Sequence, residues 1–131
     1  MIAYESTESG RWEIYLQPFP GPGARVPISV NGGAQVRWRS DGKELFFIAL
    51  DDRLMAVLIT LPANGGSAEA GVPVPLFTTR VGGAVQSFSR QQYFVSLDGQ
   101  RFLMNTTLES GPPSPITIIL NWKPRPSTQN Q

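Results

Sequence analysis

Two residue types are missing from this chain of 131 residues: cysteine and histidine. Without cysteine there are no disulfides, thiolate metal sites or cysteine nucleophiles. Without histidine the chain lacks the commonest transition-metal ligand and the usual general base near neutral pH. Charged residues are also scarce, at 16% with a net charge of +1. We therefore expect no nucleic-acid partner and no attraction to an anionic membrane.

Long apolar runs and helical periodicity are lacking as well. No stretch approaches the roughly 20 apolar residues of a membrane helix, so no membrane insertion is expected. Residues Met1–Glu5 show neither the basic start nor the apolar core of a secretion signal. The 13 glycines and 12 prolines indicate frequent turns and leave little room for long helices. The cellular compartment stays open.

The chain does contain many short runs rich in β-branched and aromatic residues, separated by turn residues. Such runs at fairly even spacing predict an all-β sandwich, barrel or propeller. We expect strands at Ile2–Tyr4, Glu13–Leu16, Val26–Val30, Val36–Trp38, Leu45–Ile48, Leu54–Ile59, Pro75–Phe77, Phe94–Ser96, Arg101–Met104 and Ile116–Leu120.

A strand–turn–strand unit occurs twice, in Val36–Phe47 and again in Tyr93–Leu103. In both copies an Asp-Gly pair stands between two apolar segments, and Gly42 and Gly99 are 57 residues apart. Aspartate bonds back to nearby backbone amides and glycine accepts a positive φ, so the pair predicts a tight turn. A recurring unit of this kind indicates a repeat architecture.

A second correspondence relates the beginning of the chain to its middle. Tyr4 matches Phe47 at a shift of 43 residues, and Ile14 matches Met55 at a shift of 41. Repeats of roughly 40 to 50 residues are typical of four-stranded propeller blades. The longer shift of 57 is explained by loops within 61–92, because loops absorb insertions at little cost.

The fold class that follows is all-β: a partial β-propeller of about two to three four-stranded antiparallel blades. The predicted blades lie at approximately 1–30, 36–77 and 93–122, so that the chain begins at the second strand of its first blade. Residues 123–131, rich in proline and polar side chains, are expected to form a disordered tail.

An ordered set of short motifs resembles TolB-like (WD-repeat-like) β-propeller repeats. The motifs are Tyr4–Arg11, Tyr15 to Pro20, Trp38 with Ser40–Gly42, Leu54–Val57, and Asn121-Trp122. They are most similar to the C-terminal propeller portion of bacterial Ser/Thr protein kinases and related signalling proteins. The third copy departs from the pattern at Leu97 and Gln100, and the chain contains no kinase domain. The resemblance therefore implies a fold and no catalytic residue.

Incomplete propellers have exposed ends. A closed propeller needs about four to eight blades, whereas this chain supplies one complete blade and two incomplete ones. Terminal repeats need polar caps, and the predicted end blades carry poor ones: Ile14, Tyr15, Phe94, Phe102, Ile118 and Trp122. At about 25 cal/mol per Å², covering both faces would yield on the order of 10 kcal/mol. We therefore expect a homo-oligomer, or attachment to the remaining propeller blades.

Two groups of side chains suggest binding, and each has a plainer structural interpretation. Aromatic residues that could stack on a sugar or a base are more simply explained as packing between blades: Trp12, Trp38, Trp122, Tyr15 and Tyr93. Arg37 and Arg39 flank Trp38 on the predicted innermost strand. They could hold an anion or carboxylate in a central channel, or face solvent from an alternating strand.

The remaining motifs favour structural roles. Four aspartates could bind calcium, but their spacing does not fit an EF-hand loop and turn formation explains them: Asp41, Asp51, Asp52 and Asp98. The proline-rich Pro18–Pro22 is expected to connect two strands, and the glycosylation pattern Asn105–Thr107 to be a chance match. No hydrolase or phosphate-binding motif occurs. We therefore expect no catalytic, cofactor-binding or metal-binding residue.

The sequence thus favours a non-catalytic propeller module that acts as a protein-interaction scaffold. The alternative is a regulatory part of a bacterial signalling protein, such as a Ser/Thr kinase, that senses a small molecule or peptide. An enzyme is not expected, because histidine and the nucleophile motifs are missing.

Overall fold

The computed structural model describes residues 1–61, 68–85 and 91–106. Throughout these ranges the chain is all-β, with antiparallel strands and no helix. Accordingly, no described segment is a helix with the length and hydrophobicity to span a membrane. The strands are β1 (Ile2–Ser6), β2 (Glu13–Gln17), β3 (Val26–Pro27), β4 (Gly33–Trp38), β5 (Glu44–Ala49), β6 (Arg53–Thr60), β7 (Glu69–Ala70), β8 (Val74–Thr78), β9 (Tyr93–Val95) and β10 (Phe102–Met104).

The predicted strands are confirmed wherever the structure describes them, with bounds that differ by one to three residues. The strand expected over Val26–Val30 ends at Pro27. Beyond it the Ser29 hydroxyl, and not a backbone carbonyl, accepts the N–H of Ile14 at 2.8 Å. The short pair β7 with β6 was not predicted. The strand expected at Ile116–Leu120 and the tail at 123–131 lie outside the described residues.

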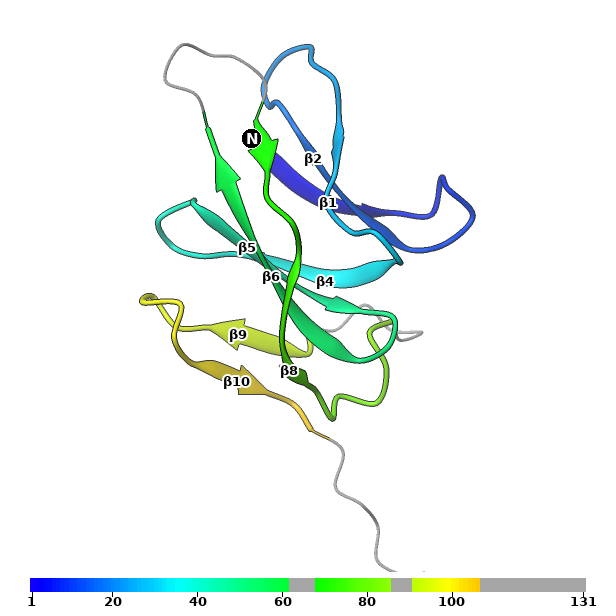
Figure 1. The fold of residues 1–131 in the computed structure, drawn as a ribbon, viewed down its shortest axis with the longest axis vertical. Helices are drawn as coiled ribbons and strands as arrows, with labels where there is room; N and C mark the ends of the chain where they lie inside the picture. Colours follow the sequence, from blue (N-terminus) through cyan, green and yellow to red (C-terminus); the bar gives the residue numbers. More distant parts are fainter. Residues whose placement is uncertain (62–67, 86–90, 107–131) are drawn as a thin grey trace, which may run out of the picture.

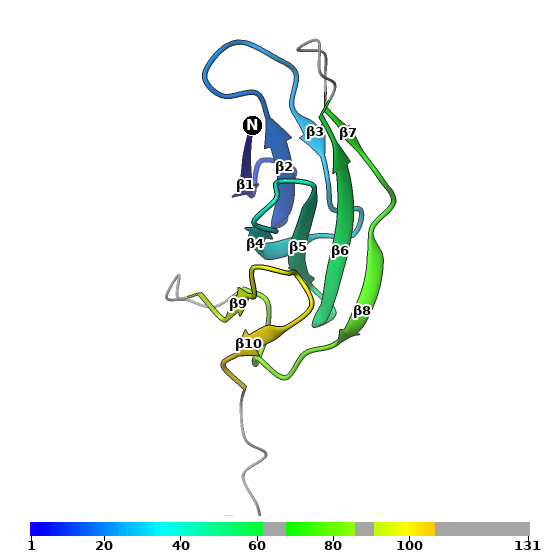
Figure 2. The ribbon, with the colours of Figure 1, turned by 90° about the vertical axis from the view of Figure 1, so that its left-hand side faces the viewer.

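The strands form three sheets that follow one another along the molecule (Figure 1). The first sheet has the order β1-β2-β3 and the third contains β9 and β10. The second has the order β4-β5-β6, with β7 and β8 each paired to a different part of β6. Figure 2 shows β1, β4 and β9 along one side of the molecule, which we call the β1–β4–β9 edge, and β3, β7 and β8 along the opposite side.

Two apolar cores separate the three sheets. Strand β5 supplies both, because successive side chains of a strand point to opposite faces. Leu45 and Phe47 join the first core, against the first sheet, while Phe46 and Ile48 join the second core, against the third sheet. All four are buried. A continuous apolar run in the sequence thus marks the strand that is covered on both faces.

The strand register corrects one predicted correspondence. Tyr4 pairs with Tyr15 in the first sheet, and Phe47 pairs with Met55 in the second. If Tyr4 is equivalent to Phe47, Met55 is therefore equivalent to Tyr15, and its assignment to Ile14 is wrong by one residue. A slip of one residue moves a side chain to the other face of a sheet. Ile14 instead lies fully buried in the first core.

Candidate functional site

The two Asp-Gly turns have the same backbone geometry. Gly42 and Gly99 have φ angles of 70° and 71°, and their N–H groups donate to the carbonyl three residues earlier at 3.0 and 2.9 Å. Oδ1 of Asp41 and Oδ1 of Asp98 each accept the N–H two residues later at 3.0 Å. The repeat that the sequence predicts at a shift of 57 residues is therefore a structural repeat of the second and third sheets.

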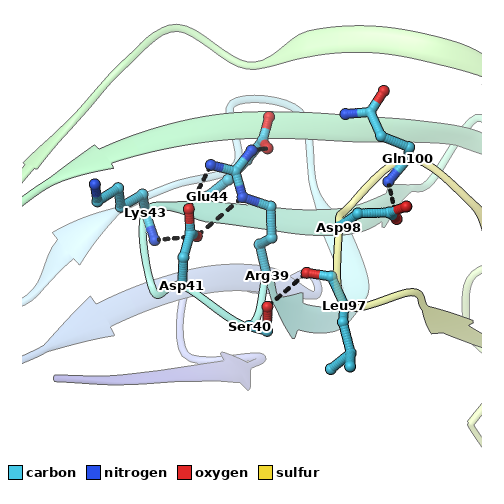
Figure 3. Close-up of polar contacts among 8 residues, drawn as sticks. All are labelled: Arg39, Ser40, Asp41, Lys43, Glu44, Leu97, Asp98 and Gln100. Atoms are coloured by element: carbon cyan, nitrogen blue, oxygen red, sulfur yellow. Dashed lines mark hydrogen bonds and ion pairs between the residues drawn. The ribbon is translucent and has the colours of Figure 1, made fainter.

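These two turns also contact each other (Figure 3). The Ser40 hydroxyl donates to the Leu97 carbonyl at 2.5 Å. Gly99 lies so close to Arg39 that a Cβ at this position would lie 2.4 Å from the Arg39 Cδ. Glycine is required here because of this close approach and because of its positive φ. The turn of the third sheet is thereby fixed against the turn of the second.

Arg39 has a structural role within this contact. Its guanidinium forms ion pairs with Asp41 at 2.6 Å and with Glu44 at 2.7 Å. The hydrogen bonds from Arg39 and from the Lys43 backbone lower the pKa of Asp41 to about 2. Because both carboxylates already occupy the guanidinium, Arg39 does not fit the anion-binding role that the sequence suggested for it.

The other suggested aspartates also lie in turns. Asp51 forms an ion pair with Arg53 at 2.6 Å, and the Asp52 carbonyl accepts the N–H and the hydroxyl of Thr79 at 2.7 and 2.8 Å. Across the described residues, no group of three or more Asp or Glu side chains is placed to hold a metal ion. The turn interpretation accounts for the side-chain contacts of Asp51, whereas Asp52 contributes its backbone carbonyl, and its Oδ1 has no hydrogen-bond partner among the described residues.

Arg37 differs from Arg39 in its surroundings. Within the ranges that the structure covers, no carboxylate forms an ion pair with Arg37, and its Nη1 donates only to the neighbouring Val36 carbonyl, at 2.8 Å. The side chain lines a cavity of about 210 Å³ at the β1–β4–β9 edge, together with Glu5, Trp12 and Gln91. The structure thus separates two arginines that the sequence treats alike.

Two cavity residues that sequence reasoning missed form a chain of hydrogen bonds between the sheets. Glu5 Oε1 accepts the Gln35 N–H at 2.7 Å, and the Gln35 side-chain carbonyl accepts the Gln92 N–H at 3.2 Å. Gln35 and Gln92 are 57 residues apart, the same shift as the two turns. This spacing was the signal that could have identified Gln35, whereas no sequence signal indicated Glu5. Gln35 has a φ of 62° and lies where the register of β4 shifts.

A buried hydroxyl lies behind the same edge. Tyr93 belongs to the second core, and its hydroxyl has no hydrogen-bond partner in the described part of the chain. Burial raises the pKa of Tyr93, whereas the Arg37 charge lowers it and the Glu5 charge raises it. The hydroxyl therefore lies within the electrostatic influence of both charged residues of the cavity.

The aromatic residues mostly pack between sheets, as their plainer interpretation predicts. Trp38 packs against the first core and Tyr93 belongs to the second. Trp12 is an exception, since it is exposed and lines the cavity beside Arg37. Trp122 lies outside the described residues. The segment Pro18–Pro22 connects β2 to β3, as expected, with a cis peptide bond between Phe19 and Pro20.

On the outward face of the first sheet Tyr15 is covered, contrary to prediction. Ile14 lies in the first core, and Tyr15, on the other face of β2, is only 8% exposed. The Tyr15 ring packs at 5.8 Å from the Tyr4 ring, and the Arg25 guanidinium lies 4.7 Å from its centroid. Arg25 also forms an ion pair with Glu8. Of the residues predicted as poor caps, Ile14 is therefore buried in the first core, and Tyr15 is covered by an aromatic and a charged neighbour.

The outward face of the third sheet is open, as the sequence predicted for Phe94. Phe94 and Leu103 are cross-strand partners, and they are 59% and 75% exposed. Phe102, on the other side of β10, packs against the second core, so it does not belong to this face. Ile118, the other predicted member, lies outside the described residues. Among the described residues, the third sheet therefore presents an apolar pair, Phe94 and Leu103, on its outward face.

No protein-family model, curated protein or solved structure matches the chain. The resemblance to TolB-like repeats therefore remains a prediction, and a function for this chain has to be argued from the geometry of its own residues.

Proposed function

We propose that this chain is a partial β-propeller that acts as a non-catalytic protein-interaction scaffold. The three sheets are then consecutive blades: the second, third and fourth strands of one blade, a complete blade, and the first two strands of a third. Three features support this assignment. The sheets are antiparallel and stack face to face, their turns repeat, and β4 and β9 lie on the same side of the molecule.

The observation that carries the proposal is a difference between two equivalent positions. The shift of 57 residues that relates the turns also relates Phe46 to Leu103. Phe46 is 2% exposed because the third sheet covers it, whereas Leu103 is 75% exposed. The same kind of face is thus filled by a neighbouring sheet in one unit and left bare in the next. A further blade, from a second copy or from the rest of a propeller, would complete it.

The experiment that tests this proposal is light scattering coupled to size exclusion at micromolar concentrations. The full chain is compared with the double variant Phe94→Ser/Leu103→Ser, and with Val72→Ser as a control at another exposed apolar residue. We expect the unmodified chain and the Val72→Ser control to associate, and the double variant to be monomeric. A monomer at every concentration, with no partner captured through this face, would contradict a scaffold role for the face.

A regulatory part that senses a ligand is the second candidate function. The observation in its favour is the cavity at the β1–β4–β9 edge, where Arg37 has no carboxylate partner among the described residues. The two functions are compatible, because the cavity and the bare face of the third sheet are formed by different side chains. The resemblance to propeller portions of bacterial signalling proteins agrees with either.

A further inference from the structure

Arg37 is exceptional in its electrostatic environment. Five other arginines of the described residues have a carboxylate partner: Arg11, Arg25, Arg39, Arg53 and Arg101. Arg37 is partly buried and forms no ion pair with the described residues. A guanidinium binds carboxylates with two parallel hydrogen bonds, and Arg37 uses one nitrogen, Nη1, for the Val36 carbonyl. Its remaining N–H groups suit an external carboxylate.

A carboxylate of the protein lines the same cavity without contacting Arg37. Glu5 and Arg37 both line the space of about 210 Å³, yet no ion pair joins them. Glu5 Oε1 is occupied by the Gln35 N–H at 2.7 Å, which leaves Oε2 for another donor. Two opposite charges that share a cavity but do not neutralise each other are complementary to a ligand that carries both charges.

We infer that this cavity binds a free α-amino acid, with its carboxylate on Arg37 and its ammonium group on Glu5. The size of the cavity supports a ligand of this class, because 210 Å³ is below the roughly 300 to 1,000 Å³ of sites for drug-sized molecules. In an α-amino acid the carboxylate and the ammonium group are bonded to the same carbon atom. A peptide, in contrast, separates them, so that either of its ends would satisfy only one side of the cavity.

The backbone that carries Arg37 is distorted in a way that fits a binding site. The register of β4 shifts between Ala34 and Arg37, and Gln35 within this stretch has a φ of 62°. Bulges redirect side chains, and non-glycine residues with positive φ cluster at functional sites. The distortion is held by the two hydrogen bonds of Gln35, to Glu5 and from Gln92, so the wall of the cavity is preformed.

The inference is tested by NMR titration of the ¹⁵N-labelled full chain with three related probes. L-alanine carries both charges, N-acetyl-L-alanine only the carboxylate, and L-alaninamide only the ammonium group. The signals to follow are the backbone amides of Gln35 and Gln91 and the indole of Trp12, three residues that line the cavity. We expect saturable shifts with L-alanine and at least tenfold weaker binding of both other probes, since each loses a charged hydrogen bond.

Matched variants assign the two contacts. Arg37→Gln and Glu5→Gln are each expected to weaken L-alanine binding about tenfold or more; in Glu5→Gln the side-chain carbonyl still accepts the Gln35 N–H. Arg53→Gln, at an arginine that is ion-paired with Asp51, should leave binding unchanged. Equal binding of N-acetyl-L-alanine would overturn the role of Glu5, and the absence of shifts with all three probes would overturn the site. Neither result depends on whether the chain associates.

Discussion

The first and third sheets flank the same central sheet but end the molecule differently. On the outward face of the first sheet, Tyr15 is covered by the Tyr4 ring and by the Arg25 guanidinium, which forms an ion pair with Glu8. The outward face of the third sheet presents the bare pair of Phe94 and Leu103. Repeat proteins need a polar cap wherever the stack stops. The first sheet therefore resembles the capped end of a repeat stack, whereas the third sheet resembles a surface that another sheet would cover.

The two flanking sheets also differ in how they are held. Each shares an apolar core with the second sheet, but the polar contacts differ: the Gln35 N–H donates to Glu5 of the first sheet, whereas the third sheet is held through its turn, by the Ser40 hydroxyl that donates to the Leu97 carbonyl. Turn contacts of this kind fix the relative position of two sheets more than they stabilise them, because a single neutral hydrogen bond contributes only about 1 kcal/mol. Substitutions in the two regions should therefore have different consequences.

The largest effect is expected from Tyr15→Ala, which removes a buried ring from the covered face. Loss of a large buried side chain costs about 3 to 5 kcal/mol of folding free energy. The matched variant Phe94→Ala removes a ring that is 59% exposed, and it should cost less than about 1 kcal/mol in a dilute monomer. Urea unfolding at low protein concentration measures both. Equal losses would remove the distinction between the two ends.

A smaller effect is expected when a methyl group is added to either Asp-Gly turn. Gly42→Ala and Gly99→Ala both place a side chain at a φ near 70°, which costs about 1 kcal/mol. A Cβ at position 42 meets nothing within 4 Å, whereas one at position 99 would lie 2.4 Å from the Arg39 Cδ. Gly99→Ala should therefore be clearly more destabilising, and urea unfolding of the two variants compares them. Equal costs would show that the turns do not hold the sheets together.

The strands and turns could be predicted because their causes are local. A continuous apolar run marks β5, and the Asp-Gly pair needs only its own backbone and side chain to form a turn. The register of β2 could not be predicted, since Ile14 and Tyr15 are both apolar and only the pairing with β1 decides which faces the core. The cover on Tyr15 also escaped prediction, because Arg25 reaches it through the chain reversal between β2 and β3.

The sequence predicted no binding residue, and it offered Arg37 and Arg39 only as alternatives to solvent-facing charges. Arg37 and Arg39 are two residues apart and look alike in sequence. Arg39 is neutralised by Asp41 and Glu44 from its own turn, which a local pattern can indicate. The opposing charge across the cavity from Arg37 is Glu5, which lies in another sheet. A contact between sheets depends on how they stack, and a single sequence carries little information about that.

The turn of the second sheet should respond to acid more strongly than the turn of the third. The Arg39 hydrogen bond lowers the pKa of Asp41 to about 2 from a model-compound value of 3.8. The hydroxyl of Ser96 is the main cause of the lowered pKa of Asp98. A carboxyl whose pKa is lowered on folding stabilises the protein above its unfolded pKa, and this contribution is lost as the pH falls through the folded pKa.

Asp41→Asn should therefore destabilise the protein by a constant amount above about pH 5, and the difference should shrink between pH 3.8 and about 2. Asp98→Asn should show a weaker dependence in the same direction. Unfolding free energies measured by urea titration across this pH range test the pair. A difference that is independent of pH for Asp41→Asn would mean that its carboxylate is not held by Arg39.

The smallest effect is expected from Arg25→Gln, which removes the charge above Tyr15. The guanidinium is largely exposed and forms its ion pair with Glu8 at the surface, so water and salt screen its interactions. Any loss of stability should disappear when the same change is made in Tyr15→Ala, because the ring is then absent and the two changes are coupled. An equal loss in both backgrounds would mean that Arg25 acts through Glu8 alone. Since the stability at stake is small, the main consequence of this arginine is that it places a charge over the Tyr15 ring on the outward face of the first sheet.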